Sequence, residues 1–268
     1  QSVEPEAGPF GEALHALGIA TTRGRYAPDA LIVERPHDPG TLQTLASEYV
    51  AQDEASQLVP LLAGALVTGK VGAFDVGAPN IQTDASDLEG IESSNFSALR
   101  VKRDILSRST VGMMFTNRSQ SLAGDGSNQL YGMDASFAFS DDFSFDTYLA
   151  KTKSPGLSGE DLSYTGQFAY AGDRYGLTSG YLVVEDNFNP EVGFLQRDNF
   201  ERYTGSARFS PRPTSIPRVS RVSLSGTTDY LWTADEHDLE TRQHQLDFSV
   251  EFDSSDEIAF YVSDEFEL

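Results

Sequence analysis

The feature that most constrains this chain is an alternation of apolar and polar side chains with a period of two residues. In the segment 130–140, Tyr131, Met133 and Phe137 share one face of an extended chain. Asp134 and Ser136 share the opposite face. The same pattern predicts strands at about 64–77, 95–106, 109–118, 142–152, 161–171, 174–185, 199–210, 218–233, 244–252 and from 258 onward. We therefore expect an all-β fold of about 11–12 antiparallel strands.

The lengths of the expected strands and of their connections narrow the choice of fold. Many strands run ten or more residues, whereas strands of soluble sheets average about 5–6 and a membrane-spanning strand needs about 9–11. Short turns alternate with long loops along the chain. The short turns are at 107–108, 140–141, 172–173 and 254–255, and the long loops are at 78–94, 119–129, 153–160, 187–198 and 234–238. The connection 211–217 is of middling length and falls on the side of the short turns. A soluble β-sandwich also alternates apolar and polar residues. Strand length and loop alternation together favour an antiparallel transmembrane β-barrel, whole or partial.

Composition excludes several classes of function. The chain has 41 acidic and 19 basic residues and a net charge of −22, which argues against a nucleic-acid partner because phosphates are bound by Lys and Arg. It has no Cys, so disulfide bonds, thiolate metal sites and Cys nucleophiles are excluded. No apolar run reaches the roughly 18 residues of a transmembrane helix. A β-barrel remains compatible, since its strands are apolar on one face only.

The first 60 residues differ from the rest. Thr41 to about Leu58 carries helical periodicity, a weaker helical stretch covers 12–20, and 21–40 is rich in Pro, Gly and Asp. We expect residues 1–60 to form a short helical segment that serves as a cap, a plug or a linker, and residues 61–268 to form the barrel domain. No charged stretch followed by an apolar run begins the chain, so no signal peptide is expected.

Several stretches are similar to a known family. They are Thr68–Gly72, Asn80–Thr83, Asn95–Ser97, Phe115–Arg118, Tyr148–Thr152, Gly156–Gly159, Gly172–Gly176, Asp186–Leu195 and Ala207–Pro213. With these stretches the segment 60–265 resembles the C-terminal β-barrel domain of unknown function in Gram-negative outer-membrane proteins that often carry a family 9-like carbohydrate-binding domain. The resemblance implies a location in the cell outer membrane, in contact with lipid and lipopolysaccharide and with other outer-membrane or periplasmic proteins. It implies no reaction and no catalytic residues.

The polar rows of the strands supply the candidate site residues. These rows would face the lumen and place basic side chains opposite acidic ones. The candidates are Arg100, Lys102, Asp134, Asp146, Arg202, Arg208, Arg221, Asp229, Asp247 and Glu251. Mixed charges in a confined pore select solutes by sign and by hydrogen bonding. The alternative is that these charges pair with one another and fill a narrow lumen.

Two loops carry oxygen ligands that a hard cation such as Ca²⁺ prefers. In the first, Asp186, Asn189 and Glu191 are weak metal-site candidates. The alternative for this loop is that Phe188 and its apolar neighbours fold back onto the barrel and pack there. The second loop holds Asp84, Asp87, Glu89 and Glu92 and could bind divalent ions that bridge lipopolysaccharide. No other cofactor is expected.

Three functions fit this sequence, and the first is preferred. In this function an outer-membrane barrel lets a polar solute pass or captures it at the cell surface. In one form of this hypothesis the solute is derived from a glycan. The second is a non-enzymatic anchor that binds a partner through its acidic loops or its N-terminal segment. The third is a barrel hydrolase that uses His244, or His237 beside Asp235 and Asp238. No nucleophile motif accompanies either His, so we expect no enzymatic activity.

Overall fold

The computed structural model describes residues 51–52, 58–59, 61–85 and 92–268, and these residues form an all-β structure. Two short strands, β1 (Ala51–Gln52) and β2 (Leu58–Val59), pair with each other. Ala51–Gln52 is thus extended where a helix was expected. Leu58, at the expected end of that helix, is likewise in a strand. Residues 41–50 and 53–57 of the expected helix and the weaker one at 12–20 lie outside the described residues.

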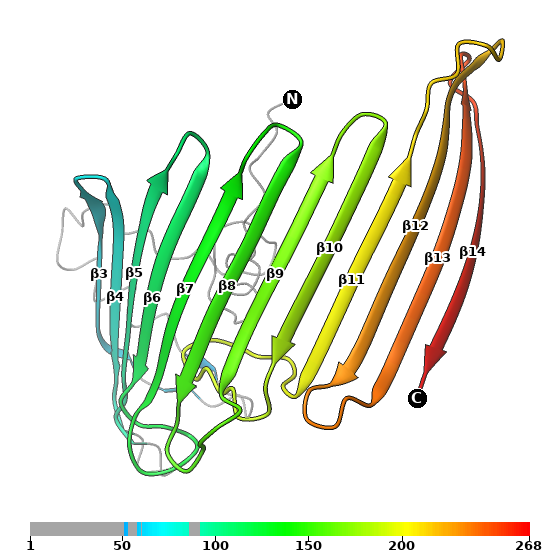
Figure 1. Cartoon of the computed structure of the whole chain (residues 1–268). Helices are drawn as coiled ribbons and strands as arrows, with labels where there is room; N and C mark the ends of the chain where they lie inside the picture. The colour runs from blue at the N-terminus through cyan, green and yellow to red at the C-terminus, as the bar shows by residue number, and fades with distance from the viewer. Residues whose placement is uncertain (1–50, 53–57, 60, 86–91) are drawn as a thin grey trace.

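The other strands form one 12-stranded antiparallel sheet in which each strand pairs with its neighbours in sequence (Figure 1). The strands are β3 (Leu61–Val71), β4 (Phe74–Thr83), β5 (Asn95–Ile105), β6 (Ser109–Arg118), β7 (Asn128–Ala138), β8 (Phe143–Lys153), β9 (Leu162–Ala171), β10 (Tyr175–Val184), β11 (Phe200–Phe209), β12 (Val219–Thr233), β13 (Leu239–Phe252) and β14 (Glu257–Glu267). The all-β, antiparallel prediction is confirmed. Among the described strands, β3 and β14 are the two edges of the sheet.

One predicted strand was wrong. The segment 64–77 was expected to be a single strand, but it contains parts of β3 and β4 and the turn between them. Gly72 takes the left-handed conformation in this turn, with φ of 63°, which glycine adopts without steric cost. The alternation continues through the turn on both sides, so periodicity alone does not reveal it.

Most connections differ in length between the two rims of the sheet, as the sequence predicts. On one rim lie the short connections 72–73, 106–108, 139–142, 172–174 and 253–256, together with the longer connection 210–218. On the other rim lie the long connections 84–94, 119–127, 154–161 and 185–199, together with the shorter connection 234–238. We call these the short-turn rim and the long-loop rim.

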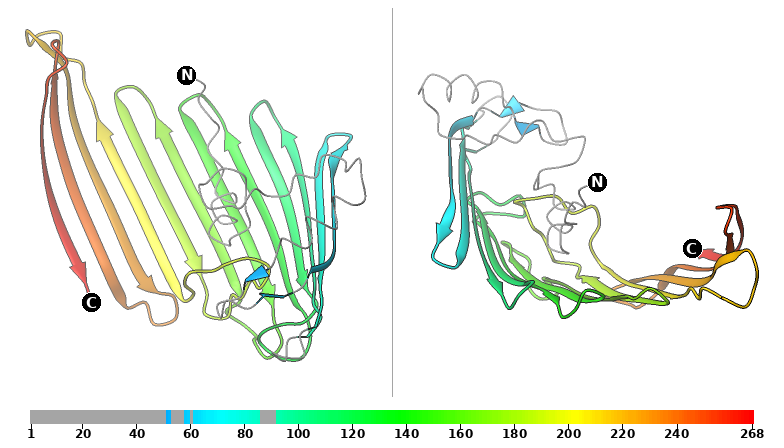
Figure 2. Two further views of the ribbon diagram at one scale, coloured as in Figure 1. Left: turned by 180° about the vertical axis from the view of Figure 1, so that it is seen from behind. Right: turned by 90° about the horizontal axis from the view of Figure 1, so that it is seen from above.

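The sheet bends into an open trough, which Figure 2 shows from above in its right-hand view. The cross-strand register keeps one row of each strand on the concave face and the other on the convex face. For example, Gly132 pairs with Met114 and Ala150 in one row, and Met133 pairs with Met113 and Leu149 in the other. The polar rows face the concave side and the apolar rows face the convex side.

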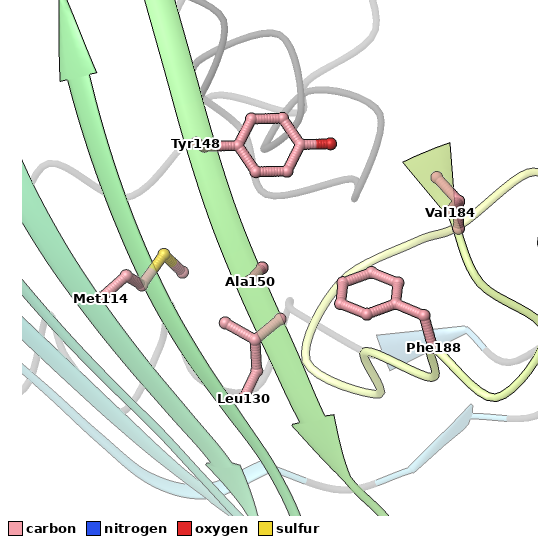
Figure 3. Close-up of a cluster of buried hydrophobic side chains, with 6 residues drawn as sticks. All are labelled: Met114, Leu130, Tyr148, Ala150, Val184 and Phe188. Atoms are coloured by element: carbon pink, nitrogen blue, oxygen red, sulfur yellow. The ribbon is translucent and has the colours of Figure 1, made fainter. Parts of the chain in front are cut away.

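The described residues have a small buried core, and it lies on the concave side. Met114, Leu130, Tyr148 and Ala150 line the wall, and Phe188 packs against them from the loop 185–199 (Figure 3). Many large apolar side chains on the convex face are exposed instead. They include Leu99, Met113, Tyr131, Met133, Leu149, Tyr175, Leu177, Tyr181, Phe209, Leu224, Leu246, Phe248, Phe260 and Val262. Within the described part of the chain, no helix is long and apolar enough to cross a membrane.

Candidate functional site on the concave face

The structure places all ten charged candidate residues on the concave face. Each occupies a register position in the row that contains Gly132 and Ala150. The positions belong to β5 (Arg100, Lys102), β7 (Asp134), β8 (Asp146), β11 (Arg202, Arg208), β12 (Arg221, Asp229) and β13 (Asp247, Glu251). Strand periodicity was therefore sufficient to assign their face.

Arg100 and Asp134 form an ion pair that bridges over β6. Arg100 Nη1 lies 2.7 Å from Asp134 Oδ1, and Nη2 donates to Oδ2 at 2.8 Å. Gly112 stands between them on β6, and a Cβ there would lie 2.2 Å from Arg100 Nη1. The hydrogen bond and the ion-pair contact hold the guanidinium beside the carboxylate, and the glycine provides the space for it.

Arg202 and Asp229 form a second ion pair, at the side of a groove. Arg202 Nε donates to both Asp229 oxygens, at 3.0 and 3.1 Å. The groove has a volume of about 840 Å³ and lies between the wall of β6 to β14 and the loop 185–199. Its polar lining includes Gln167, Thr204 and Gln243, and its larger apolar lining includes Leu182, Phe188 and Leu231. The groove thus combines an apolar part with amide and hydroxyl groups and with the Arg202–Asp229 ion pair.

A smaller hollow of about 550 Å³ lies near the short-turn rim. Arg208 and Arg221 both line it, together with Glu251 and Glu257. Arg208 donates to the carbonyl oxygen of Gly172 at 2.8 Å and to Ser210 Oγ at 2.9 Å. Arg221 stands opposite Glu251 in the register of β12 and β13. The structure therefore brings three of the predicted site residues together here.

The remaining candidates are more dispersed. Lys102 stands opposite Asp75 of β4, a residue that the sequence did not single out and that pairs with Lys70 at 3.3 Å. Asp146 lies opposite Gln167 of β9. Asp247 accepts a hydrogen bond from Gln245 Nε2 at 2.7 Å. Asp146 thus borders the groove through Gln167, whereas the contacts given for Lys102 and Asp247 join them neither to the groove nor to the hollow at Arg221.

The loop 185–199 folds into the trough, as the alternative interpretation of its apolar residues predicts. Glu191 carries most of the attachment: its side chain is 1% exposed. Its carboxylate accepts hydrogen bonds from Ser121 Oγ at 2.7 Å, from the backbone N–H of Leu122 at 2.9 Å and from Asn189 Nδ2 at 3.2 Å. Arg118 Nε lies 3.8 Å away. A buried carboxylate is stable only with such donors.

Buried polar side chains of the wall hold the backbone of the same loop. Asn128 Nδ2 donates to the carbonyl oxygen of Asn189 at 2.7 Å, and its Oδ1 accepts from the N–H of Glu191 at 3.2 Å. Thr152 Oγ1 accepts from the N–H of Asn189 at 3.0 Å. Sequence reasoning missed Asn128 and Thr152, because each sits in an ordinary polar row and nothing in the periodicity identifies its loop partner.

Two of the three metal-site candidates, Asn189 and Glu191, are placed by these contacts. Asn189 directs its amide nitrogen, a donor, at Glu191, whose carboxylate is occupied by donors from three residues. The described residues hold no cluster of three or more His, Asp or Glu side chains suited to a metal ion. Of the acidic loop 84–92, Asp87 and Glu89 lie outside the described residues, so a cation there stays a prediction.

The two described histidines lie on the convex side of the sheet or at its rim. His244 of β13 contacts Thr228 Oγ1 and the hydroxyl of Tyr230, each at 3.1 Å. His237 Nδ1, from the loop 234–238, lies 3.4 Å from Glu201 Oε1. In the same loop, hydrogen bonding by Asn199 and by the N–H of Glu236 holds the pKa of Asp235 below its ordinary value. The concave face and the histidines are thus separate features of the molecule.

Comparison with known proteins finds no family model that matches the chain and no curated protein that resembles it.

Proposed function

We propose that this chain forms the wall of an outer-membrane β-barrel, whole or partial, whose concave face lines a passage or capture site for a polar solute. The observation that carries the proposal is the convex face, where rows of large apolar side chains are exposed along the sheet. A contiguous apolar surface of this extent is unusual on a water-soluble monomer. In a bilayer the same rows would meet hydrocarbon and the concave face would meet water.

Strand dimensions support this proposal. The 12 strands of the sheet run from 10 to 15 residues. Ten residues at about 3.3 Å each span about 33 Å, and a tilt of about 40° reduces this to about 25 Å, the height of the apolar band of outer-membrane barrels.

The aromatic residues of the convex face form two bands, which also supports the proposal. Near the short-turn rim lie Phe139, Phe143, Tyr170, Tyr175 and Phe209, and near the long-loop rim lie Tyr131, Tyr164, Tyr181, Tyr203, Tyr230 and Trp232. Aliphatic side chains such as Met113, Met133 and Leu149 lie between the bands. Outer-membrane barrels carry aromatic girdles at both membrane interfaces in this way.

The concave face suggests which solutes the barrel would admit. Arg100 and Arg202 are each paired with an aspartate, so these two cations are compensated. The groove beside the loop 185–199 offers amides and hydroxyls next to a larger apolar part that includes Leu182, Phe188 and Leu231. A neutral solute with both hydroxyl groups and apolar faces, such as a glycan-derived one, fits this lining, because its hydroxyls exchange hydrogen bonds with water for hydrogen bonds with the wall and its apolar faces lie on the apolar part. The proposal assigns the chain no enzymatic reaction.

The proposal places the convex face against lipid and lipopolysaccharide, and the long loops within reach of other outer-membrane or periplasmic proteins. It also requires further pairing along β3 and β14, since an open sheet edge does not occur in hydrocarbon. Either these two strands meet each other or strands outside the described sheet complete the barrel.

Two measurements test the proposal. The chain, folded in a non-ionic detergent, should migrate differently on a denaturing detergent gel before and after boiling. A folded membrane barrel resists unfolding by the denaturing detergent of the gel until the sample is heated. Co-migration would refute the barrel. In a planar bilayer, discrete ion currents are expected for a passage. A heat-modifiable protein that leaves the bilayer silent would instead support the alternative function, a membrane anchor that binds a partner.

A further inference from the structure

A small pocket on the convex face, at the long-loop rim, combines a carboxylate with aromatic rings. It has a volume of about 330 Å³ and is lined by Tyr181, Glu201, Tyr203, Trp232 and His237. It lies on β10, β11 and β12, which are neighbours in the sheet (Figure 1). It opens on the opposite face from the groove and the hollow, although Tyr181 also borders the groove. Its rings belong to the aromatic band at the long-loop rim, and no role described so far uses Glu201.

The register explains why the rings surround the carboxylate. Glu201 stands directly opposite Trp232 of β12, and Tyr203 directly opposite Tyr181 of β10. Tyr203 follows Glu201 by two residues and therefore lies on the same face. Trp232 thus lies beside Glu201 on the neighbouring strand, Tyr203 lies two residues along the same strand, and Tyr181 lies diagonally across from it on β10. Tyr230 stacks on Trp232, with ring centroids 5.1 Å apart and planes at 2°, and supports that ring from behind.

The carboxylate of Glu201 retains much of its capacity to accept hydrogen bonds. Its side chain is 16% exposed. Its contacts among the described residues are the hydroxyl of Tyr181, which donates to Oε2 at 2.7 Å, and the imidazole of His237, 3.4 Å from Oε1. A carboxylate has about four acceptor positions, so one or two donors leave room for a ligand.

Two cations of the convex face are paired with other carboxylates. Arg242 of β13 donates to Asp264 at 2.9 Å, and Lys151 of β8 donates to Asp161 at 2.6 Å. Glu201 has neither an arginine nor a lysine among its contacts in the described part of the chain. A carboxylate ringed by Tyr and Trp faces attracts a cation with apolar substituents, because ring faces and carboxylate are both negative and the rings also cover alkyl groups.

We propose that Glu201, Tyr181, Tyr203 and Trp232 bind an organic ammonium ion at the outer surface of the sheet. The ammonium group sits against the carboxylate and its carbon substituents lie on the rings. Two sources share this chemistry: the headgroup of an amine-bearing lipid and a free ammonium solute. The site goes beyond the proposed function, because it lies on the opposite face from the solute groove and does not require the chain to conduct anything.

Trp232 is the only Trp of the chain and reports on this pocket directly. We would titrate the full chain in a maltoside detergent with tetramethylammonium chloride at constant ionic strength and follow Trp fluorescence. A saturable change is expected, and tert-butanol, which has a similar shape and no charge, should give none. Glu201→Gln should raise the midpoint at least about tenfold. Tyr203→Leu should raise it as well, since it removes one ring. Circular dichroism would show that each variant is folded.

Glu240→Gln is the matched control. Glu240 lies near the same rim and pairs with Arg197, not with the aromatic pocket. The titration midpoint of the Glu240→Gln variant should therefore equal that of the unmodified chain. A linear, non-saturating response, or a Glu201→Gln midpoint equal to that of the control, would overturn the site.

Lipid nanodiscs distinguish the two sources. If the lipid supplies the ammonium, Trp232 in phosphatidylethanolamine discs should already give the signal of the saturated state, and tetramethylammonium should change it only in phosphatidylglycerol discs. If a free solute is the ligand, both discs should respond alike. Failure of either disc to respond, with Trp232 in the unsaturated state in both, would refute the proposal even if the protein is a heat-modifiable barrel.

Discussion

A single arginine on the convex face tests which solvent that face meets. Met133 lies near the middle of β7, 54% exposed, beside Met113 at 65% and Leu149 at 42%. Met133→Arg places a charge at the centre of this apolar patch. If the patch faces hydrocarbon, arginine near the bilayer midplane costs about 2–4 kcal/mol. If it faces water, an exposed substitution costs no more than about 0.5 kcal/mol.

The expected cost corresponds to a roughly 30- to 700-fold change in the folding equilibrium constant. Urea unfolding of the protein in lipid vesicles, followed by the fluorescence of Trp232, would measure it. Thr227→Arg is the matched control: Thr227 lies mid-strand on the concave face of β12, opposite Ser206 and Gln245. It should change stability by no more than about 0.5 kcal/mol. Equal, small effects of the two substitutions would show that hydrocarbon does not cover the convex face.

Three further predictions concern the concave face. Asp229→Asn leaves Arg202 without its ion-pair partner, so if the face conducts, reversal potentials in a salt gradient should shift toward anion selectivity; stability should change by no more than about 1 kcal/mol, because both side chains are partly exposed. Glu191→Ala leaves Ser121 Oγ and the N–H of Leu122 without their acceptor, at a cost of about 1–3 kcal/mol, and trypsin should cleave after Arg197 faster than in a Glu236→Gln control; an unchanged cleavage rate would contradict the attachment inferred for this loop. Phe188→Ala removes the ring that fills the cluster around Leu130 and Ala150 and should cost about 3–5 kcal/mol if the loop unfolds together with the sheet; a smaller change in urea unfolding, accompanied by faster cleavage at Arg197, would show that the loop detaches on its own.

Strand periodicity predicted the fold and the face of each candidate residue. Alternation in segments such as 130–140 and 142–152 indicates which side chains share a face, because successive side chains of a strand point to opposite sides. The difference in connection length between the two rims was predicted by counting the residues between the expected strands. The turn at Gly72 was missed, because a two-residue turn between two alternating segments leaves the alternation almost undisturbed.

The partners of the site residues were beyond the reach of this reasoning. Periodicity places Arg100 and Asp134 on one face, but their contact across β6 also depends on register and on the missing side chain of Gly112. The attachment of Glu191 to Ser121 joins residues 70 positions apart in the chain. No local pattern specifies such a contact, since it forms only when two loops fold toward the same wall.

The sequence by itself determined an antiparallel all-β chain with one apolar and one charged face, because side-chain alternation is a local property of the extended backbone. Only the tertiary structure decided how the sheet curves, which charges pair within the trough, and that the loop 185–199 folds into it. It alone placed Glu201 among Tyr181, Tyr203 and Trp232, because three separate strands must align in register before their side chains can form one site.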